Sequence, residues 1–234
     1  MHDESLLPED VPRVDAHPNV VTLETFVQCK ELHQNVTLLM LGQARLGKSE
    51  LTKMLCMHMA LMYHPRERAC FVFALTIDAL RGNQAHMLPG VPVLLDDMKV
   101  SSTGRGQIIY SDASMWKSVL QCKDASATRA RQNEVMWAYR QPKMITTNTL
   151  TSDKWIEELD PWAEQEHRAA LKARLAEVRV TGRLYVNDSA PSDWQSYLPA
   201  VASYQEAAAT LSSLFDQIFV NSSTIGLSWL WVQI

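Results

Sequence analysis

Two apolar patterns meet at Gly42. Val36 to Leu41 is a six-residue, almost wholly apolar run, which is typical of a strand buried in a parallel sheet. Beyond the glycines that follow, apolar side chains recur at helical spacing. This helix is expected to end at His64-Pro65, because a proline disfavours the helical conformation in the residue before it. The apolar positions of the helix are Leu51, Met54, Leu55, Cys56, Met59 and Met62.

Short apolar runs and helical stretches continue to alternate along the chain. Ile77 to Arg81 predicts a helical turn, while Gly82 and Pro89-Gly90 predict loops. Glu157 to Arg174 has the pattern of one helix. The expected strands are Val36–Leu41, Cys70–Leu75, Val91–Leu95, Lys143–Asn148 and either Val178–Val180 or Arg183–Val186. This alternation favours an α/β fold, here a three-layer sandwich with a mainly parallel five-stranded sheet.

The two ends of the chain differ from its centre. Residues 1–20 hold three prolines and several acids and are expected to form a poorly ordered lead-in, followed by a short helix over Thr22–His33. A polar stretch around Pro191 marks a boundary, which gives a domain over 21–190 and an extension over 191–234. One apolar stripe predicts a helix in the extension, packed on its own domain or on a partner. The stripe is Val201, Tyr204, Ala208, Leu211, Phe215 and Ile218.

The residues between the first strand and its helix match a phosphate-binding motif. Gly42, Gly47, Lys48 and Ser49 fit G-x-x-x-x-G-K-[ST]. The free N–H groups and positive dipole end of the helix would face a phosphate. Lys48 would reach the β- and γ-phosphates, and Ser49 would offer its hydroxyl to Mg²⁺. A chance match is the alternative, but the flanking strand and helix argue against it. We therefore expect the P-loop NTPase fold, with nucleotide bound by Gly42, Gln43, Ala44, Arg45, Leu46, Gly47, Lys48, Ser49 and Glu50.

The third strand ends in two carboxylates. Val91 to Leu95 runs directly into Asp96-Asp97, which is a Walker B pattern when it follows a phosphate loop. Asp96 would then hold the Mg²⁺ shell, while Asp97 orients and polarises the attacking water. The alternative is a strand that ends in solvent with two exposed acids. The spacing from the phosphate loop favours the Walker B interpretation.

The fourth strand ends in polar residues, Thr146-Thr147-Asn148. In a sheet that carries a phosphate loop, an Asn at a strand tip beside the two Walker strands can hold the attacking water against the γ-phosphate.

Met98 to Lys143 differs in charge from the rest of the chain. This segment of 46 residues carries a net charge of +5, whereas the remainder carries −9. Aromatic residues such as Trp116 and Trp137 are interleaved, which suits a single-stranded nucleic-acid track. The alternative, a solvated basic surface with core aromatics, is the one that composition alone favours. The basic residues are Lys99, Arg105, Lys117, Lys123, Arg129, Arg131, Arg140 and Lys143.

The overall composition limits the class of protein. The chain has 234 residues and 47% hydrophobic content, enough for one sizeable α/β domain, and its net charge of −4 argues neither for nor against nucleic acid. No secretory signal is recognisable, and no run reaches the roughly 18 apolar residues of a membrane span. The widely spaced cysteines, Cys29, Cys56, Cys70 and Cys122, are expected to be reduced. We expect a soluble intracellular protein, cytoplasmic or nuclear, with no membrane partner.

Taken together, these motifs resemble those of superfamily 3 helicases, the AAA+-related motors found in replication initiators of small DNA viruses and related mobile elements. The family's order is Walker A, Walker B, a basic segment and a strand ending in Asn. Here that order is GQARLGKS, VPVLLDD, residues 117–131 and KMITTN, and the resemblance spans about residues 36–186. It implies an ATP hydrolase for DNA replication that uses ATP and Mg²⁺. It also implies a homo-oligomeric ring around single-stranded nucleic acid, and DNA is the form expected.

The resemblance also implies roles for single residues. Asn148 would be the sensor that touches the γ-phosphate and the water. The segment between Walker B and the Asn strand would carry a loop into the ring pore, and its matches here are Lys123, Arg129 and Arg131.

The family's arginine finger lies on the helix after the Asn strand. This indicates Arg174, with Arg168 as the second candidate. The nicking-endonuclease domain of many viral initiators is not expected, because 35 residues precede the first strand. The residues after 190 match no part of the family.

Two other functions remain open. A P-loop kinase of a small molecule shares Walker A, but it normally adds a lid with clustered arginines and needs no Asn at the strand end. A non-catalytic nucleotide-dependent scaffold, or a domesticated remnant, would no longer unwind nucleic acid. The intact Lys48, Ser49, Asp96 and Asp97 argue against a complete loss of ATP handling.

Overall fold

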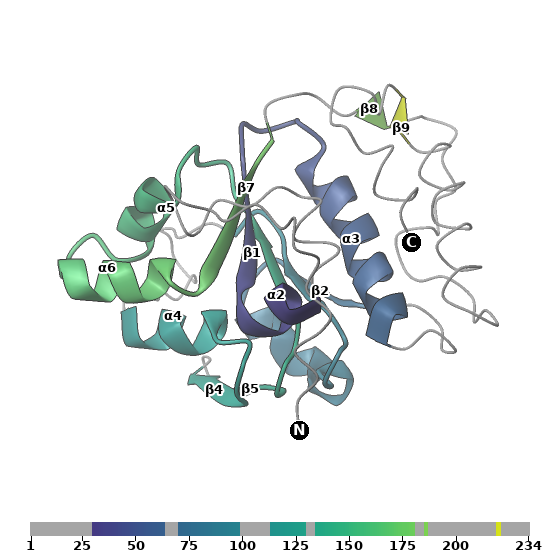
Figure 1. The fold of residues 1–234 in the computed structure, drawn as a ribbon, viewed down its shortest axis with the longest axis horizontal. Coiled ribbons are helices and arrows are strands. Elements are labelled where there is room, and N and C mark those ends of the chain that lie inside the picture. The colour runs from purple at the N-terminus through teal and green to yellow at the C-terminus, as the bar shows by residue number, and fades with distance from the viewer. Residues whose placement is uncertain are drawn as a thin grey trace, which may run out of the picture.

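Five strands form the central sheet of the protein (Figure 1). The computed structural model describes residues 30–63, 70–98, 113–129, 134–180, 185–186 and 219–220. The strands of the sheet are β1 (Thr37–Leu41), β2 (Val72–Ala74), β3 (Val93–Leu95), β6 (Lys143–Thr146) and β7 (Leu175–Arg179). Their order is β2-β3-β6-β1-β7, and every neighbouring pair is parallel. The predicted α/β class is therefore confirmed, and β6 lies between β1 and β3.

Helices cover both faces of this sheet (Figure 1). The helices are α2 (Lys30–Asn35), α3 (Lys48–Tyr63), the 3₁₀ helix η1 (Asp78–His86), α4 (Ala113–Leu120), α5 (Ser152–Leu159) and α6 (Gln165–Lys172). α3 packs on one face, where Thr52 Oγ1 donates a hydrogen bond of 3.2 Å to Met40 Sδ on β1. The helices α4, α5 and α6 lie on the other face (Figure 1). The described residues thus form three layers.

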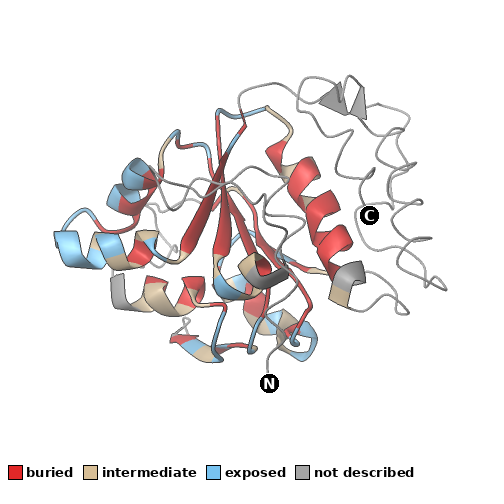
Figure 2. Cartoon of the chain, in the orientation of Figure 1, coloured by how far each residue is buried: buried red, intermediate tan, exposed pale blue. Residues whose placement is uncertain are grey.

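The core is densest around β1, all of whose residues are buried (Figure 2). Leu39 and Leu41 belong to a cluster that includes Trp116 of α4 and Trp155 of α5. The two indole rings meet edge to face with their centroids 5.7 Å apart. Because successive residues of a strand point to opposite faces, Met40 faces α3 instead. Burying each such side chain contributes roughly 1.5–3 kcal/mol, which explains why the apolar run of β1 is almost continuous.

A β-hairpin lies within the basic segment, where the sequence pattern predicted no strands. β4 (Ser126–Arg129) and β5 (Glu134–Trp137) pair antiparallel. Trp137 Nε1 donates to Thr128 Oγ1 at 2.7 Å, and Met136 N donates to Gln84 Oε1 of η1 at 2.8 Å. The hairpin is therefore fastened to the rest of the domain at its base.

The prediction of one helix over Glu157–Arg174 is wrong, because the segment forms α5 and α6 with a turn between them. Pro161 causes the break: it disfavours the helical conformation in the preceding residue. Asp160 is accordingly extended, with φ −146° and ψ 92°, and α5 ends at Leu159.

Two smaller expectations also changed. The fifth strand is β7, which begins before Val178–Val180, while β8 (Tyr185–Val186) pairs with β9 (Phe219–Val220) in a separate two-stranded antiparallel sheet. Gly82, which was expected in a loop, lies inside η1.

Some expectations concern residues outside the described ranges. They are the lead-in over 1–20, the helix over Thr22–His33 except for its end in α2, and the apolar stripe over 201–218. Among the described residues, no helix is long and apolar enough to cross a membrane. Cys56 and Cys122 are buried and free.

Candidate functional site

The loop between β1 and α3 lies at the carboxyl edge of the sheet and depends on its glycines. Gly42 and Gly47 have φ values of 147° and 84°, which residues with a Cβ rarely adopt. A Cβ at Gly42 would lie 2.6 Å from the carbonyl oxygen of Val180. The backbone N–H of Gly42 donates to the carbonyl of Thr149 at 3.1 Å. The loop is therefore held between β7 and the segment after β6.

Lys48, at the start of α3, is folded back over this loop. Its Nζ donates to the carbonyl oxygens of Gly42 at 2.8 Å and Gln43 at 2.6 Å, and to Oδ1 of Asn148 at 3.1 Å. The side chain is buried. Burial lowers the pKa of Lys48, whereas the carboxylates of Asp97 and Asp96 act in the opposite direction. The ammonium thus lies beside the carboxyl ends of β1 and β6.

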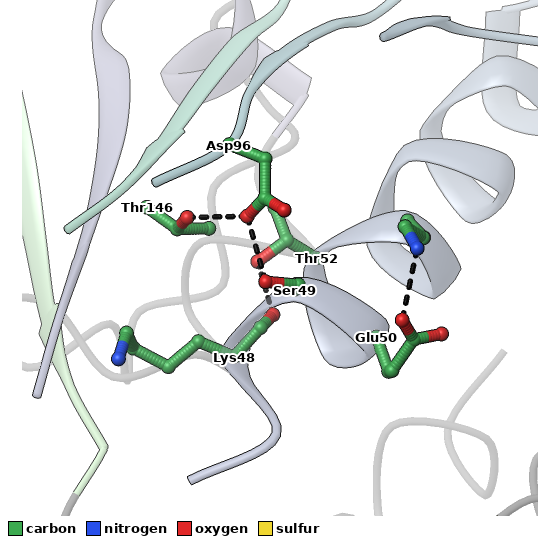
Figure 3. Close-up of polar contacts among 7 residues, drawn as sticks. Lys48, Ser49, Glu50, Thr52, Asp96 and Thr146 are labelled. Carbon is green, nitrogen blue, oxygen red and sulfur yellow. Dashed lines mark hydrogen bonds and ion pairs between the residues drawn. The ribbon is translucent and has the colours of Figure 1, made fainter. Parts of the chain in front are cut away.

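Ser49 and Asp96 are in direct contact (Figure 3). Ser49 Oγ donates to Asp96 Oδ1 at 2.7 Å, and Thr146 Oγ1 donates to the same oxygen at 2.5 Å. Asp96 and Thr146 are both buried. The two residues that were predicted to hold Mg²⁺ are therefore adjacent, although they are 47 positions apart in the sequence.

Asp97 and Asn148 form the more exposed part of the site. Asn148 Nδ2 donates to Asp97 Oδ1 at 2.7 Å, so that Asn148 bridges Asp97 and Lys48. Asp97 has a left-handed backbone with φ 45°, and its N–H donates to Thr146 Oγ1 at 2.8 Å. This turn separates the two acids, since Asp96 points toward Ser49 and Asp97 toward Asn148.

Sequence reasoning missed the role of Thr146. Its one hydroxyl donates to the Asp96 carboxylate and accepts from the Asp97 backbone. The polar end of the fourth strand indicated that Thr146 could be part of a site. Its contacts with Asp96 and Asp97, however, depend on β6 lying beside β3. Thr149, whose carbonyl anchors Gly42, was missed for the same reason.

The remaining loop residues differ in position. Gln43, Ala44 and Arg45 are exposed, while Leu46 and Gly47 are half-buried. Glu50 forms an ion pair with Lys53 at 2.8 Å (Figure 3). The structure therefore directs the Glu50 carboxylate along α3.

Arg174 lies at the opposite edge of the sheet. Its carbonyl accepts a hydrogen bond from the N–H of Thr37, the first residue of β1, whereas the loop follows the last residue of β1. The strand rises roughly 3.3 Å per residue, so Arg174 is far from Lys48 in the same chain. Its guanidinium donates to Gln121 Oε1 at 3.2 Å and to the carbonyl of Ala170 at 2.5 Å. Arg174 therefore cannot reach the loop after β1 in its own chain.

The basic segment divides into surface and core residues. Lys123 and Arg140 are exposed. Arg129 ends β4, and Arg131 lies outside the described residues. Lys143, in contrast, is buried, and its Nζ donates to the carbonyls of Val119 and Gln121.

Three members of the basic and aromatic pattern are thus core residues and not part of a surface track. Trp116 and Trp137 are each 1% exposed. Lys143 Nζ lies 4.2 Å from the centroid of the Trp137 ring, and burial lowers the Lys143 pKa to about 8. A lysine near the last carbonyls of α4 stabilises the negative end of that helix.

No protein-family model matches the chain, and no curated protein matches it in a sequence comparison. Within the described residues there is also no group of three or more His, Cys, Asp or Glu side chains that could hold a metal ion.

Proposed function

We propose that the chain is a P-loop ATPase that works as a superfamily 3 helicase-like motor on single-stranded nucleic acid. The observation that carries the proposal is the chain of contacts from Lys48 through Asn148 to Asp97, with distances of 3.1 and 2.7 Å. It brings the phosphate-loop lysine, a Walker B acid and the Asn of the fourth strand together. Phosphoryl transfer needs these groups in one place, because it depends on positioning and on charge stabilisation.

The donor set of the site fits Mg-ATP. Ser49 Oγ and Asp96 Oδ1 are hard oxygen ligands 2.7 Å apart, of the kind that Mg²⁺ binds together with substrate phosphates. When bound, Mg²⁺ neutralises charge on the phosphate oxygens. Lys48 is already held over the loop by two carbonyls, so its ammonium is pre-positioned for an anion that the loop and the α3 N-terminus bind.

Asp97 and Asn148 would act on the attacking water. Asp97 is the acid that does not face Ser49, and its carboxylate would polarise the water and accept its proton. The Asn148 amide, held between Lys48 and Asp97, would fix the water against the γ-phosphate. Hydrolysis would then respond to any movement between β6 and β3, the strands that these two residues follow.

The β4–β5 hairpin supports a role in nucleic-acid binding. It lies between the Walker B acids and the Asn strand, where the resemblance implies a pore loop. Arg129 is the last residue of β4, and Arg131 comes two positions later in the sequence. Val135 and Trp137 anchor the hairpin in the core, which gives the strand that ends at Arg129 a fixed base. Exposed Lys123 precedes it.

Hydrolysis assays with and without single-stranded DNA test the proposal. We expect added single strands to stimulate ATP turnover, and we expect Lys48→Ala to abolish turnover. Lys53→Ala, a change five residues further along the same helix, is the matched control and should remain active. Turnover that requires a small acceptor would favour a kinase, and tight binding without turnover would favour a scaffold. Full activity in Lys48→Ala would remove the basis of the proposal.

A further inference from the structure

Trp162 is the most exposed large hydrophobic residue in the described part of the chain. It is 91% exposed, whereas the other exposed large hydrophobic residues there range from 41 to 56%. The other described tryptophans, Trp116, Trp137 and Trp155, are each 1% exposed. Trp162 lies in the turn Asp160–Glu164 between α5 and α6. An indole presented in this way favours a contact with a partner, since tryptophan is enriched at the energetic centres of interfaces.

The turn that carries Trp162 is rigid. Asp160 Oδ1 accepts a hydrogen bond from the N–H of Trp162 at 3.1 Å, and the Asp160 carbonyl accepts from Ala163 N at 3.2 Å. The Arg168 side chain donates to the carbonyls of Pro161 at 3.2 Å and Ala163 at 2.9 Å. Ala163 also packs against the core. The backbone that carries the indole is therefore pre-organised, and little backbone entropy would be lost when the turn docks on a partner.

The charges around Trp162 indicate the chemistry of that partner. Four exposed glutamates lie within five residues of it, namely Glu157, Glu158, Glu164 and Glu166. Sites that stack nucleic-acid bases on aromatic rings combine them with positive charge, so these acids argue against a nucleic acid. They favour a protein surface with exposed arginine or lysine, because a guanidinium can pair with the carboxylates and also lie over the indole.

We propose that the turn Asp160–Glu164 is the surface by which one copy of the chain docks, head to tail, onto a second copy. This inference rests on the ring assembly of the proposed function and names a surface for it. The chain carries the complementary charge itself, as Arg45 and Arg179 are exposed at the carboxyl edge of the sheet. The acidic turn and these arginines are different patches, and a contact between different patches closes a ring when the rotation allows.

Sedimentation equilibrium of the full chain, with Mg²⁺ and a non-hydrolysable ATP analogue, tests the docking surface. We expect concentration-dependent self-association that Trp162→Ala weakens by roughly 30-fold or more, the scale of an interface hot spot. Leu88→Ala, which truncates a side chain that is 54% exposed, is the matched control and should associate normally. Arg179→Glu should weaken association, and pairing it with Glu164→Lys and Glu166→Lys should restore part of the loss.

The outcomes separate this inference from the proposed function. A wild-type chain that assembles, but is indifferent to Trp162→Ala and to the charge reversals, would overturn the docking surface alone. A chain that stays monomeric at every concentration would overturn the ring as well. If Trp162→Ala instead abolishes binding of a single-stranded oligonucleotide while assembly is unchanged, the occupant is nucleic acid and the proposal is wrong.

Discussion

Thr146 and Asp96 are joined by a hydrogen bond of 2.5 Å between the ends of neighbouring strands, β6 and β3. The same threonine oxygen accepts the N–H of Asp97 at 2.8 Å. One hydroxyl therefore holds the Asp96 carboxylate toward Ser49 and stabilises the left-handed turn at Asp97. Thr146 is a positioning residue, because it acts on the proposed chemistry only through the two acids.

Replacing Thr146 should show this positioning role. Thr146→Val keeps the shape but removes both hydrogen bonds, which should cost about 1–3 kcal/mol of unfolding free energy. We expect the Mg²⁺ concentration for half-maximal hydrolysis to rise roughly tenfold or more, the scale seen when a partner of a metal ligand is lost. Thr146→Ser should restore both values. A purely structural role would lower stability without changing the Mg²⁺ dependence.

The two acids should separate by role. Asp97→Asn should bind Mg-ATP but lower turnover by about 100-fold or more, because the group that polarises the water is lost. Asparagine tolerates the left-handed backbone of residue 97, so the fold should be unaffected. Asp96→Asn should instead raise the Mg²⁺ requirement. Nucleotide binding and steady-state hydrolysis measure the two effects, with Asp124→Asn as a control on an exposed acid. Normal hydrolysis in both variants would mean that the carboxylates serve only the fold.

Binding to single strands should depend on the basic residues at and before the hairpin. Each phosphate contact adds about 0.7 to the slope of log affinity against log salt for single strands. Replacing Lys123, Arg129 and Arg131 by alanine together should therefore lower the slope by about 2. Fluorescence anisotropy over a series of salt concentrations measures it, and Lys154→Ala is the control. An unchanged slope would assign these residues to a solvated surface.

Arg174 should act on the nucleotide of a neighbouring subunit. An arginine donated in trans to a phosphoryl transition state is worth roughly 10³–10⁵ in rate, while it adds little to ground-state binding. Arg174→Ala should therefore bind ATP almost normally and hydrolyse it slowly. Mixing it with Lys48→Ala should restore some activity, because mixed rings pair an intact finger with an intact loop. If co-assembled subunits regain nothing, Arg174 is not a finger in trans.

Acid should destabilise the protein through His58. Burial lowers the pKa of His58 to about 3, and buried His33 nearby acts in the same direction. The unfolded chain binds a proton near pH 6.5, whereas folded His58 stays neutral, so stability should fall as the pH drops from 6.5 toward 3. We expect His58 to lower the unfolding free energy by about 2 kcal/mol between pH 6.5 and 5. Urea unfolding at each pH measures this loss. His58→Gln should remove that part of the pH dependence, and replacing exposed His86 should not.

The sequence by itself determined the local elements of the site. The apolar run before Gly42, the helical spacing after Lys48 and the carboxylates after Leu95 all depend on neighbouring residues, so their patterns predicted β1, α3 and β3. Local signals were weaker where no continuous apolar run marks the element. The β4–β5 hairpin was missed, since its strands read SATR and EVMW, and the break at Pro161 was missed within an otherwise helical pattern.

Only the tertiary structure decided which residues meet. The order β2-β3-β6-β1-β7 puts β6 between β3 and β1, and this brings Asn148 against Lys48, 100 positions earlier in the chain. The burial of Lys143 and the exposure of Trp162 were also not predictable from the sequence, because composition does not show whether a charged or aromatic side chain is buried. Parallel strands pair through backbone groups that all residues share, so sheet order depends on how whole helices pack, and no single segment encodes it.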